Sequence, residues 1–241
     1  MAKTIWTAEY TVNSLVLNAQ KRLGLHGLLS ILQDVAWAHA EDLGFGYDSM
    51  AQSGTFWVLS RQVIRMQRWP GWGETLTVDS WARPFSGPLA PRDFILRVGD
   101  TVIGEATSLW LTLNSQTRRP MRHPEGILCR EDGAINLQAD KIIPVAGLPR
   151  RATRRVQNSD LDMNGHVNNT HYARWILDCL PAETLARFTA AQYSVNFLTE
   201  TGPGEDVTLL GGPVTEAGNL WQFQGCRSDG KTLFLAEISP S

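Results

Sequence analysis

Two spacings of hydrophobic residues follow one another along the first half of the chain, and each predicts one kind of element. Strands are predicted where β-forming residues alternate or cluster, at residues 9–17, 56–67, 74–82, 91–98 and 102–114. One helix is predicted where apolar residues recur at helical spacing before two glycines: Leu25, Leu28, Leu29, Leu32, Val35, Ala36 and His39, then Gly44 and Gly46. We expect strand 56–67 to turn at residues 70–73 and pair with strand 74–82, which makes the last four strands a meander.

The same order of elements returns in the second half. Between residues 123 and 149 the periodicity weakens and prolines and glycines are frequent, so this stretch is predicted to connect two halves. Beyond it we predict a strand, a helix and four more strands, at residues 154–159, 169–180, 191–200, 205–210, 219–226 and 231–238. Each half is therefore predicted to be a helix lying on an antiparallel sheet.

The two halves also align residue by residue, which indicates an internal repeat. Setting Gly24-Leu-His26 under Asn164-Gly-His166 aligns the helices, and setting residues 73–78 under residues 204–209 aligns two strands. In these frames three pairs differ in chemistry: Arg22 against Asp162, Gly24 against Asn164, and Trp69 against Glu200. Only the second copy keeps the polar set, so we expect the second half to do chemistry and the first to hold a substrate. A chance likeness of two α+β halves is the alternative.

Polar residues gather just before the second helix. In extended backbone Asp162, Asn164 and His166 would share one face, since they alternate with two other residues. An Asn at 168 or 169 is a suitable N-cap for the helix, whose first turn would offer unpaired N–H groups to a carbonyl. The competing interpretation is a turn-and-cap network without catalytic chemistry.

Composition narrows the classes of protein. The 241 residues are 43% hydrophobic and 19% charged, typical of a folded globular protein. A net charge of -2 gives no general attraction to nucleic acid or anionic membranes. Three scattered cysteines form neither a disulfide framework nor a metal cluster, and no stretch is predicted to be a signal peptide or a membrane span. We therefore expect a soluble cytoplasmic protein that needs no metal or other cofactor.

The motif Ser159-Asp-Leu-Asp-Met-Asn-Gly-His-Val-Asn-Asn169, followed by Trp175-Ile-Leu-Asp178, resembles the signature of the acyl-acyl carrier protein thioesterases of bacteria and plant plastids. Segments of the first half are similar too, among them Trp57-Val-Leu-Ser-Arg61 and Trp69-Pro-Gly-Trp-Gly73. The resemblance implies an α+β double hotdog fold, in which each long helix is wrapped by an antiparallel sheet. The implied parts are an N-terminal acyl-binding hotdog at residues 1–130, a linker at 131–149 and a catalytic hotdog at 150–241.

The resemblance also implies the catalytic residues: Asp162, Asn164, His166 and Glu200. Thioester hydrolysis needs a water or side-chain nucleophile, a proton acceptor and donors facing the oxyanion, and this set supplies a base, an orienting acceptor and a polarising donor. Either Glu200 and His166 activate water while Asp162 orients Asn164, or Asp162 attacks the carbonyl directly. Plant members carry a Cys directly after the Glu, but Thr201 stands there in this chain, so a cysteine nucleophile is not available at that position.

Other residues are predicted from the resemblance to meet the substrate. The acyl chain would enter the first hotdog, with its depth set by Trp37, Phe56, Trp57 and Met66. An acidic acyl carrier protein, bearing the acyl chain on phosphopantetheine, would dock on two basic clusters: Arg118, Arg119 and Arg122, and Arg150, Arg151, Arg154 and Arg155. A solvated basic surface is the alternative for both clusters. His39 is expected to be a packed residue, and His171 is expected on the exposed side of its helix.

The expected function is release of free fatty acid from acyl carrier protein, which ends fatty acid synthesis. Two alternatives stay open: a hotdog thioesterase acting on coenzyme A esters, and an acyl-binding hotdog protein without turnover. The preferred acyl chain length and the oligomeric state, including a homodimer, are left open by the sequence.

Overall fold

The structure is a computed structural model that describes residues 2–85, 87–133 and 135–240. The chain divides into two compact units, the first formed by Met1–Ile64 and Arg68–Ala139, the second by Arg65–Gln67 and Asp140–Ser241. Within the described residues each unit contains five strands and one main helix, α1 or α3, as the repeated pattern predicts, together with shorter helices, and each unit is described by itself below.

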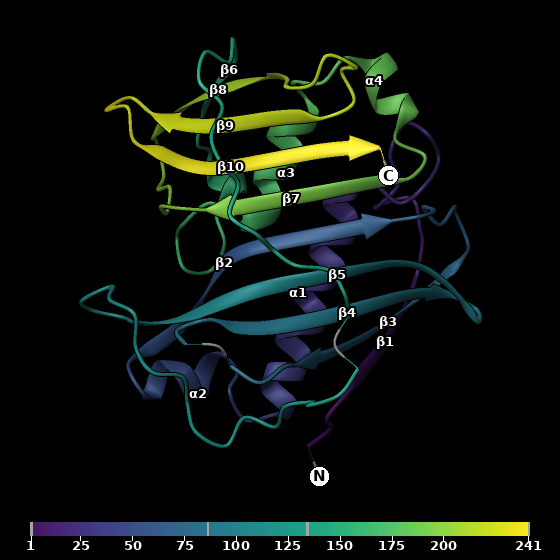
Figure 1. Cartoon of the computed structure of the whole chain (residues 1–241). Coiled ribbons are helices and arrows are strands. Elements are labelled where there is room, and N and C mark those ends of the chain that lie inside the picture. Colours follow the sequence, from purple (N-terminus) through teal and green to yellow (C-terminus); the bar gives the residue numbers. More distant parts are fainter. Residues whose placement is uncertain (1, 86, 134, 241) are drawn as a thin grey trace. The chain divides into compact units, whose positions relative to one another are not determined.

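The first unit is a curved antiparallel sheet with a long helix against it (Figure 1). Its elements are β1 (Trp6–Thr11), α1 (Leu25–Asp42), α2 (Tyr47–Gln52), β2 (Thr55–Met66), β3 (Thr75–Ala82), β4 (Ala90–Val98) and β5 (Thr101–Asn114). The strand order is β1-β3-β4-β5-β2, and α1 packs on β1 and β3. The short helix α2 was not expected from the sequence.

The predicted helix is confirmed, and its burial explains its position. The residues at helical spacing, from Leu25 to His39, form the buried face of α1. The helix ends where Gly44 takes a left-handed φ of 80°, a conformation in which a side chain would be strained.

The predicted pairing of β2 with β3 is wrong. β3 lies between β1 and β4, and β2 lies at the other side of β5, so the four strands are not a meander. The reason is the segment between them, which is held by the residues after β1 instead of forming a tight hairpin. Gly73 N donates to Val12 O (2.8 Å), Val12 N donates to Glu74 O (2.9 Å), and Leu23 N donates to Pro70 O (2.8 Å).

The second unit repeats the first, strand for strand. Its elements are β6 (Arg150–Arg155), the one-turn helix η1 (Asn158–Asp160), α3 (Asn169–Leu177), α4 (Ala182–Arg187), β7 (Ala191–Phe197), β8 (Asp206–Pro213), β9 (Trp221–Arg227) and β10 (Thr232–Pro240). The order β6-β8-β9-β10-β7 matches β1-β3-β4-β5-β2 element by element. α3 lies against the sheet in Figure 1, and Tyr172 of α3 packs on Phe197 of β7 and Phe234 of β10.

A small hairpin precedes the long helix of the first unit. Asn18 N donates to Arg22 O (2.8 Å), and Lys21 N donates to Asn18 O (3.0 Å). The Asn18 carboxamide oxygen accepts from Gln20 N (3.0 Å) and more weakly from Arg22 N (3.4 Å). Lys21 takes a left-handed φ of 59°, which closes the turn.

The second unit has the same hairpin before α3, bond for bond. Asp162 N donates to His166 O (2.8 Å), and Gly165 N donates to Asp162 O (3.0 Å) at a φ of 75°. The repeat therefore exists, but the alignment proposed from the sequence is out of frame on this side, because the helices begin at Leu25 and Asn169. The matching residues are Asn18 and Asp162, Gln20 and Asn164, Arg22 and His166, and Gly24 and Asn168.

A buried cation lies between α1 and the sheet of the first unit. Arg92 is 8% exposed, and its Nη1 donates to His39 Nδ1 (2.9 Å) and to Ser80 Oγ (3.1 Å). His39 is fully buried, as expected of a packed residue, and its Nε2 lies 2.8 Å from Lys3 O. These partners require a neutral ring protonated at Nε2. Burial, and then the Arg92 charge, lower the pKa of His39 to about 4.

The lowered pKa of His39 predicts that the free energy of unfolding decreases in acid and that His39 causes part of this decrease. Between pH 6.5 and 4 the unfolded chain binds a proton at His39 that the folded chain does not, so stability is lost as the pH falls through that window. Urea unfolding of the wild type and of His39→Gln, measured at pH 7.5, 5.5 and 4.5, should show a smaller loss in the variant. Equal losses in the two proteins would contradict the assignment.

Candidate active site

The hairpin of the second unit carries three of the four predicted catalytic residues. Asp162 begins the turn, Asn164 lies at its exposed tip, and His166 leaves it half-buried. The prediction that these residues share one face of an extended strand is wrong. They instead surround a tight turn, which Gly165 closes in the left-handed conformation.

The Asp162 side chain holds this turn together. Its Oδ1 accepts from Asn164 N (2.8 Å) and, at the limit of hydrogen bonding, from His166 N (3.5 Å). An Asp that accepts from the backbone two residues later is a common turn stabiliser. Asn18 makes the equivalent bonds in the first unit, so this function of Oδ1 does not require a charge.

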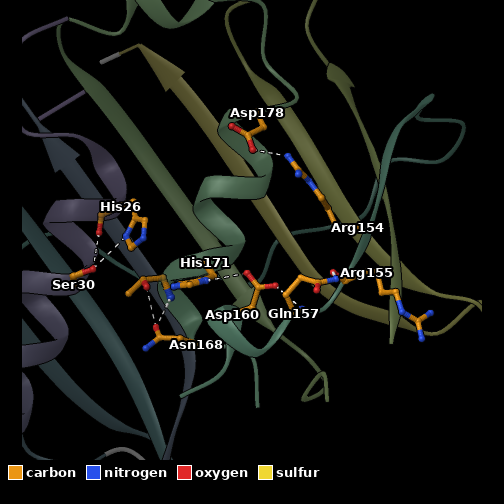
Figure 2. Close-up of polar contacts among 10 residues, drawn as sticks. His26, Ser30, Arg154, Arg155, Gln157, Asp160, Asn168, His171 and Asp178 are labelled. Atoms are coloured by element: carbon orange, nitrogen blue, oxygen red, sulfur yellow. Dashed lines mark hydrogen bonds and ion pairs between the residues drawn. The ribbon is translucent and has the colours of Figure 1, made fainter. Parts of the chain in front are cut away.

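A second layer of polar contacts holds the base of the hairpin. Figure 2 shows Asp160 directed at His171 of α3, with Asp160 Oδ1 3.2 Å from His171 Nδ1. The other oxygen of Asp160 accepts from Gln157 N (2.8 Å), and Asp160 O accepts from Asn168 N (2.8 Å). Asp160 and His171 are each 15% exposed, so the expected exposed position of His171 is wrong. The pair ties the hairpin to the first turn of α3.

The N-terminus of α3 is capped as predicted, with a consequence for the chemistry. Asn168 Oδ1 accepts from Thr170 N (3.0 Å) and from the Thr170 hydroxyl (2.9 Å). His171 N donates to Asn168 O (2.9 Å). Two of the first-turn N–H groups are therefore engaged within the chain, contrary to the expectation that this turn offers unpaired donors to a carbonyl.

Glu200 comes from the far end of β7 and lies beside His166. It follows the strand by three residues, so it stands on the loop after β7 and not on the predicted strand. The backbone oxygen of Thr201, which follows Glu200, accepts from the backbone N–H of Val167, which follows His166 (2.9 Å). This bond brings Glu200 and His166 close together. His166 Nε2 lies 3.8 Å from Glu200 Oε2, and the side chains are 33% and 36% exposed. This gap is beyond direct hydrogen bonding, and the site is open to solvent.

Two residues beneath this contact were not singled out as partners from the sequence. Thr201 is fully buried, and Tyr172 is 3% exposed. The Tyr172 hydroxyl donates to Thr201 Oγ1 (2.9 Å). No local pattern links them because they lie on a helix and a distant loop, and only the fold brings them together.

The residues proposed to meet the acyl chain occupy different environments. Trp37 is 41% exposed and stacks on Tyr47, with ring centroids 5.9 Å apart. Arg118 lies over the ring of Phe56 at 4.5 Å. The Trp57 indole donates to Phe45 O (3.1 Å), and Met66 at the end of β2 is fully buried.

The two arginine clusters differ in how strongly they are engaged. Arg119 and Arg122 are exposed, on the irregular segment after β5. The other four lie on β6, at an edge of the second unit's sheet. Arg154 pairs with Asp178, as Figure 2 shows, and Arg155 Nη1 lies 3.4 Å from Asp206 Oδ2. Arg151 Nε donates to Gly211 O (2.7 Å), and Arg150 Nη2 donates to Thr153 Oγ1 (2.6 Å).

The described residues contain neither a metal cluster nor a membrane-spanning helix. Within residues 2–85, 87–133 and 135–240, no three His, Cys, Asp or Glu side chains are grouped to hold a metal ion. In the same part of the chain, no helix has the length and apolar character to cross a membrane.

Two helix-on-sheet units, one of which carries Asp162, Asn164 and His166 on a hairpin beside Glu200, define a double hotdog protein. Residues 3–130 match the acyl-ACP thioesterase N-terminal domain, and residues 149–238 match the acyl-ACP thioesterase C-terminal domain. The chain therefore belongs to the acyl-ACP thioesterase family, and the predicted fold is confirmed.

Individual relatives agree. An acyl-ACP thioesterase from Bacteroides thetaiotaomicron is 26% identical, with a TM-score of 0.89 over 98% of this chain and 97% of that one. The 12:0-ACP thioesterase from Umbellularia californica is 19% identical with a TM-score of 0.85 over 99% and 98%, a likeness of fold. The chloroplastic oleoyl-acyl carrier protein thioesterase 1 of Arabidopsis thaliana is 27% identical over 232 residues, which are 87% of this chain. The match spans 64% of that relative's length.

Because both units form the same hairpin, we predict that the turn at Asp162 needs a side-chain oxygen but not its negative charge. Asp162→Asn should leave the free energy of unfolding near that of the wild type, because Asn18 accepts the same backbone bonds in the first unit. Asp162→Ala removes the acceptor and should lower it by about 1 kcal/mol. Urea unfolding at pH 7.5 measures both. A loss in Asp162→Asn as large as that in Asp162→Ala would show that the turn needs the charge.

Proposed function

We propose that this protein hydrolyses the thioester of acyl-acyl carrier protein and releases a free fatty acid. The observation that carries the proposal is that His166 Nε2 lies 3.8 Å from Glu200 Oε2 in a site open to solvent. His166 stands on the hairpin whose turn the Asp162 side chain stabilises. Family membership supports the substrate class, since related proteins are named for oleoyl, palmitoyl and dodecanoyl carrier-protein esters.

In the proposed mechanism a water molecule is the nucleophile. The gap between His166 Nε2 and Glu200 Oε2 is too wide for a direct bond, but one water can bond to both groups. Glu200 and His166 would together take one proton from this water as it attacks the thioester carbonyl. The C–S bond would then break, and the phosphopantetheine sulfur would leave with that proton as the free thiol while the fatty acid is released. A positioned base of this kind accelerates hydrolysis by about 10²–10⁴-fold.

Asp162 and Asn164 have supporting roles in this proposal. Asp162 Oδ1 already accepts from the backbone of its own turn, which favours an orienting role over direct attack on the carbonyl. The carboxylate fixes the turn that presents Asn164, whose exposed side-chain amide would donate to the developing oxyanion. Because Thr170 N and His171 N already donate to Asn168, the hydrogen bond to the oxyanion would come from Asn164 and not from the first turn of α3.

Several finer points belong to the same proposal. Trp37, Phe56, Trp57 and Met66 would line the acyl-binding region, and residues 131–149 would link the two hotdogs. We place the protein in the cytoplasm, because its three cysteines, Cys129, Cys179 and Cys226, are unpaired, as in a reducing compartment. A homodimer would be revealed by its mass in light scattering.

The proposal is tested by hydrolysis of matched acyl-carrier-protein and acyl-coenzyme A panels. Asp162→Ala, His166→Ala and Glu200→Ala should each lower kcat by about 10²-fold or more. Asp162→Ala releases the turn that presents Asn164, and the other two remove the groups that take the proton from water. Asn164→Ala should behave alike, and Gln20→Ala, its counterpart in the first unit, serves as the matched control with unchanged kcat.

Three outcomes would count against the proposal. Absence of hydrolysis in the wild type would leave an acyl-binding protein. Equal or faster turnover of coenzyme A esters would assign the alternative thioesterase. Rates within a few-fold of wild type in all the variants would move the chemistry elsewhere.

Docking of the acidic carrier protein is a separate prediction. Two double variants, Arg119→Ala with Arg122→Ala and Arg150→Ala with Arg155→Ala, should raise KM for acyl-acyl carrier protein several-fold and flatten its rise with salt. KM for a short soluble thioester should not change. Arg174→Ala with Arg187→Ala removes the same charge from two exposed positions outside the clusters and is the control. An identical salt response in all of these proteins would exclude both clusters.

A further inference from the structure

Thr201 joins the two segments of the site through its backbone and its side chain. Its carbonyl oxygen accepts from Val167 N (2.9 Å), and its Oγ1 accepts from the Tyr172 hydroxyl (2.9 Å). Glu200 directly precedes Thr201, and His166 directly precedes Val167. Because the two residues share a peptide bond, a displacement of Thr201 would also displace Glu200.

Tyr172 is a rigid support for this contact. It projects from the buried face of α3, and its ring packs against Phe197 of β7 at 5.5 Å and Phe234 of β10 at 4.8 Å. A ring held on two strands leaves its hydroxyl little freedom to move. Burial raises the pKa of Tyr172, and the nearby carboxylates of Glu205, Glu200 and Asp162 add to the rise, so the hydroxyl keeps its proton at neutral pH.

The first unit shows which part of this arrangement the scaffold needs. In the matched frames Leu28 stands for Tyr172 and Pro70 stands for Thr201, and both are buried. Leu23 N still donates to Pro70 O (2.8 Å), although neither residue of the matching pair carries a hydroxyl. The backbone pairing therefore forms without a side-chain bond. The hydroxyl pair occurs in the unit where the preceding residue is Glu200 and not where it is Trp69.

We propose that the hydrogen bond between Tyr172 and Thr201 fixes the loop that carries Glu200, so that the carboxylate stays beside His166 during turnover. Tyr172 and Thr201 are then positioning residues. This inference rests on the proposed thioester hydrolysis and adds two residues to it.

The experiment compares Thr201→Val and Tyr172→Phe, which remove one hydroxyl each with little change of shape, with Thr201→Ser, which restores the hydroxyl. The first two should lower kcat on acyl-acyl carrier protein by about 10-fold or more with little change in KM, because misplaced groups act mainly on the chemical step. Thr201→Ser should recover most of the rate. The double variant should be no slower than the slower single variant, since both remove the same bond.

Tyr193→Phe is the matched control. Tyr193 is 2% exposed on β7, and among the described residues its hydroxyl has no hydrogen-bond partner. Removing the Tyr193 hydroxyl shows the effect of losing a buried hydroxyl elsewhere in the same unit, and it should leave kcat unchanged. Thermal unfolding of every variant should give a single transition, which separates loss of position from loss of fold.

A structural measurement makes the result independent of activity. In crystals of Thr201→Val, the distance from His166 Nε2 to Glu200 Oε2 should increase beyond that in the wild type, and in Tyr193→Phe it should not. Unchanged distance, or a wild-type kcat in Thr201→Val while Glu200→Ala is impaired, overturns the inference. If Glu200→Ala is itself fully active, the proposed mechanism fails instead.

Discussion

One backbone hydrogen bond, from Val167 N to Thr201 O, holds together the site from which function is inferred. It is 2.9 Å long and joins the hairpin before α3 to the loop after β7. Without it, the segments that carry His166 and Glu200 would lose this direct backbone connection. Because a backbone bond is insensitive to side-chain identity, the same connection persists in the first unit between Leu23 and Pro70, where the side chains have different chemistry.

The hairpin shows how one side chain can serve both folding and chemistry. Asp162 and Asn18 accept from equivalent backbone N–H groups, so an oxygen at this position is a requirement of the turn. Only the charge distinguishes Asp162. The same separation applies at the closing residue, since Gly165 and Lys21 share the left-handed conformation with φ of 75° and 59°. The two units share the backbone conformation of the hairpin, and the proposed catalytic groups differ between them only in their side chains.

Local patterns predicted the elements well, because each depends on residues close in sequence. The buried face of α1 and the Asn168 cap of α3 were both evident from spacing and residue type. Pairing was less predictable. β2 and β3 are neighbours in sequence, but the loop between them bonds to the residues after β1, which no local pattern reveals.

The site followed the same division between local and distant contacts. Asp162, Asn164 and His166 were found through a local motif and its family resemblance, and the structure places Glu200 beside His166. The predicted frame of the repeat was wrong because it aligned His26 with His166, whereas the hydrogen bonds of the turn match Arg22 with His166. The contact of Tyr172 with Thr201 and the half-buried position of His171 against Asp160 depend on folded geometry. The boundaries of the linker at residues 131–149 stay a prediction.

Fusing two copies in one chain has an evolutionary consequence. In a symmetric dimer of identical hotdog chains, a mutation alters both copies at once, so a change that helps one site and harms the other cannot persist. Covalent duplication removes that symmetry. At matched positions the first half carries Arg22 and Trp69 where the second carries His166 and Glu200. In a fused chain, a substitution at one of these positions therefore changes one half and leaves its counterpart in the other half unaltered.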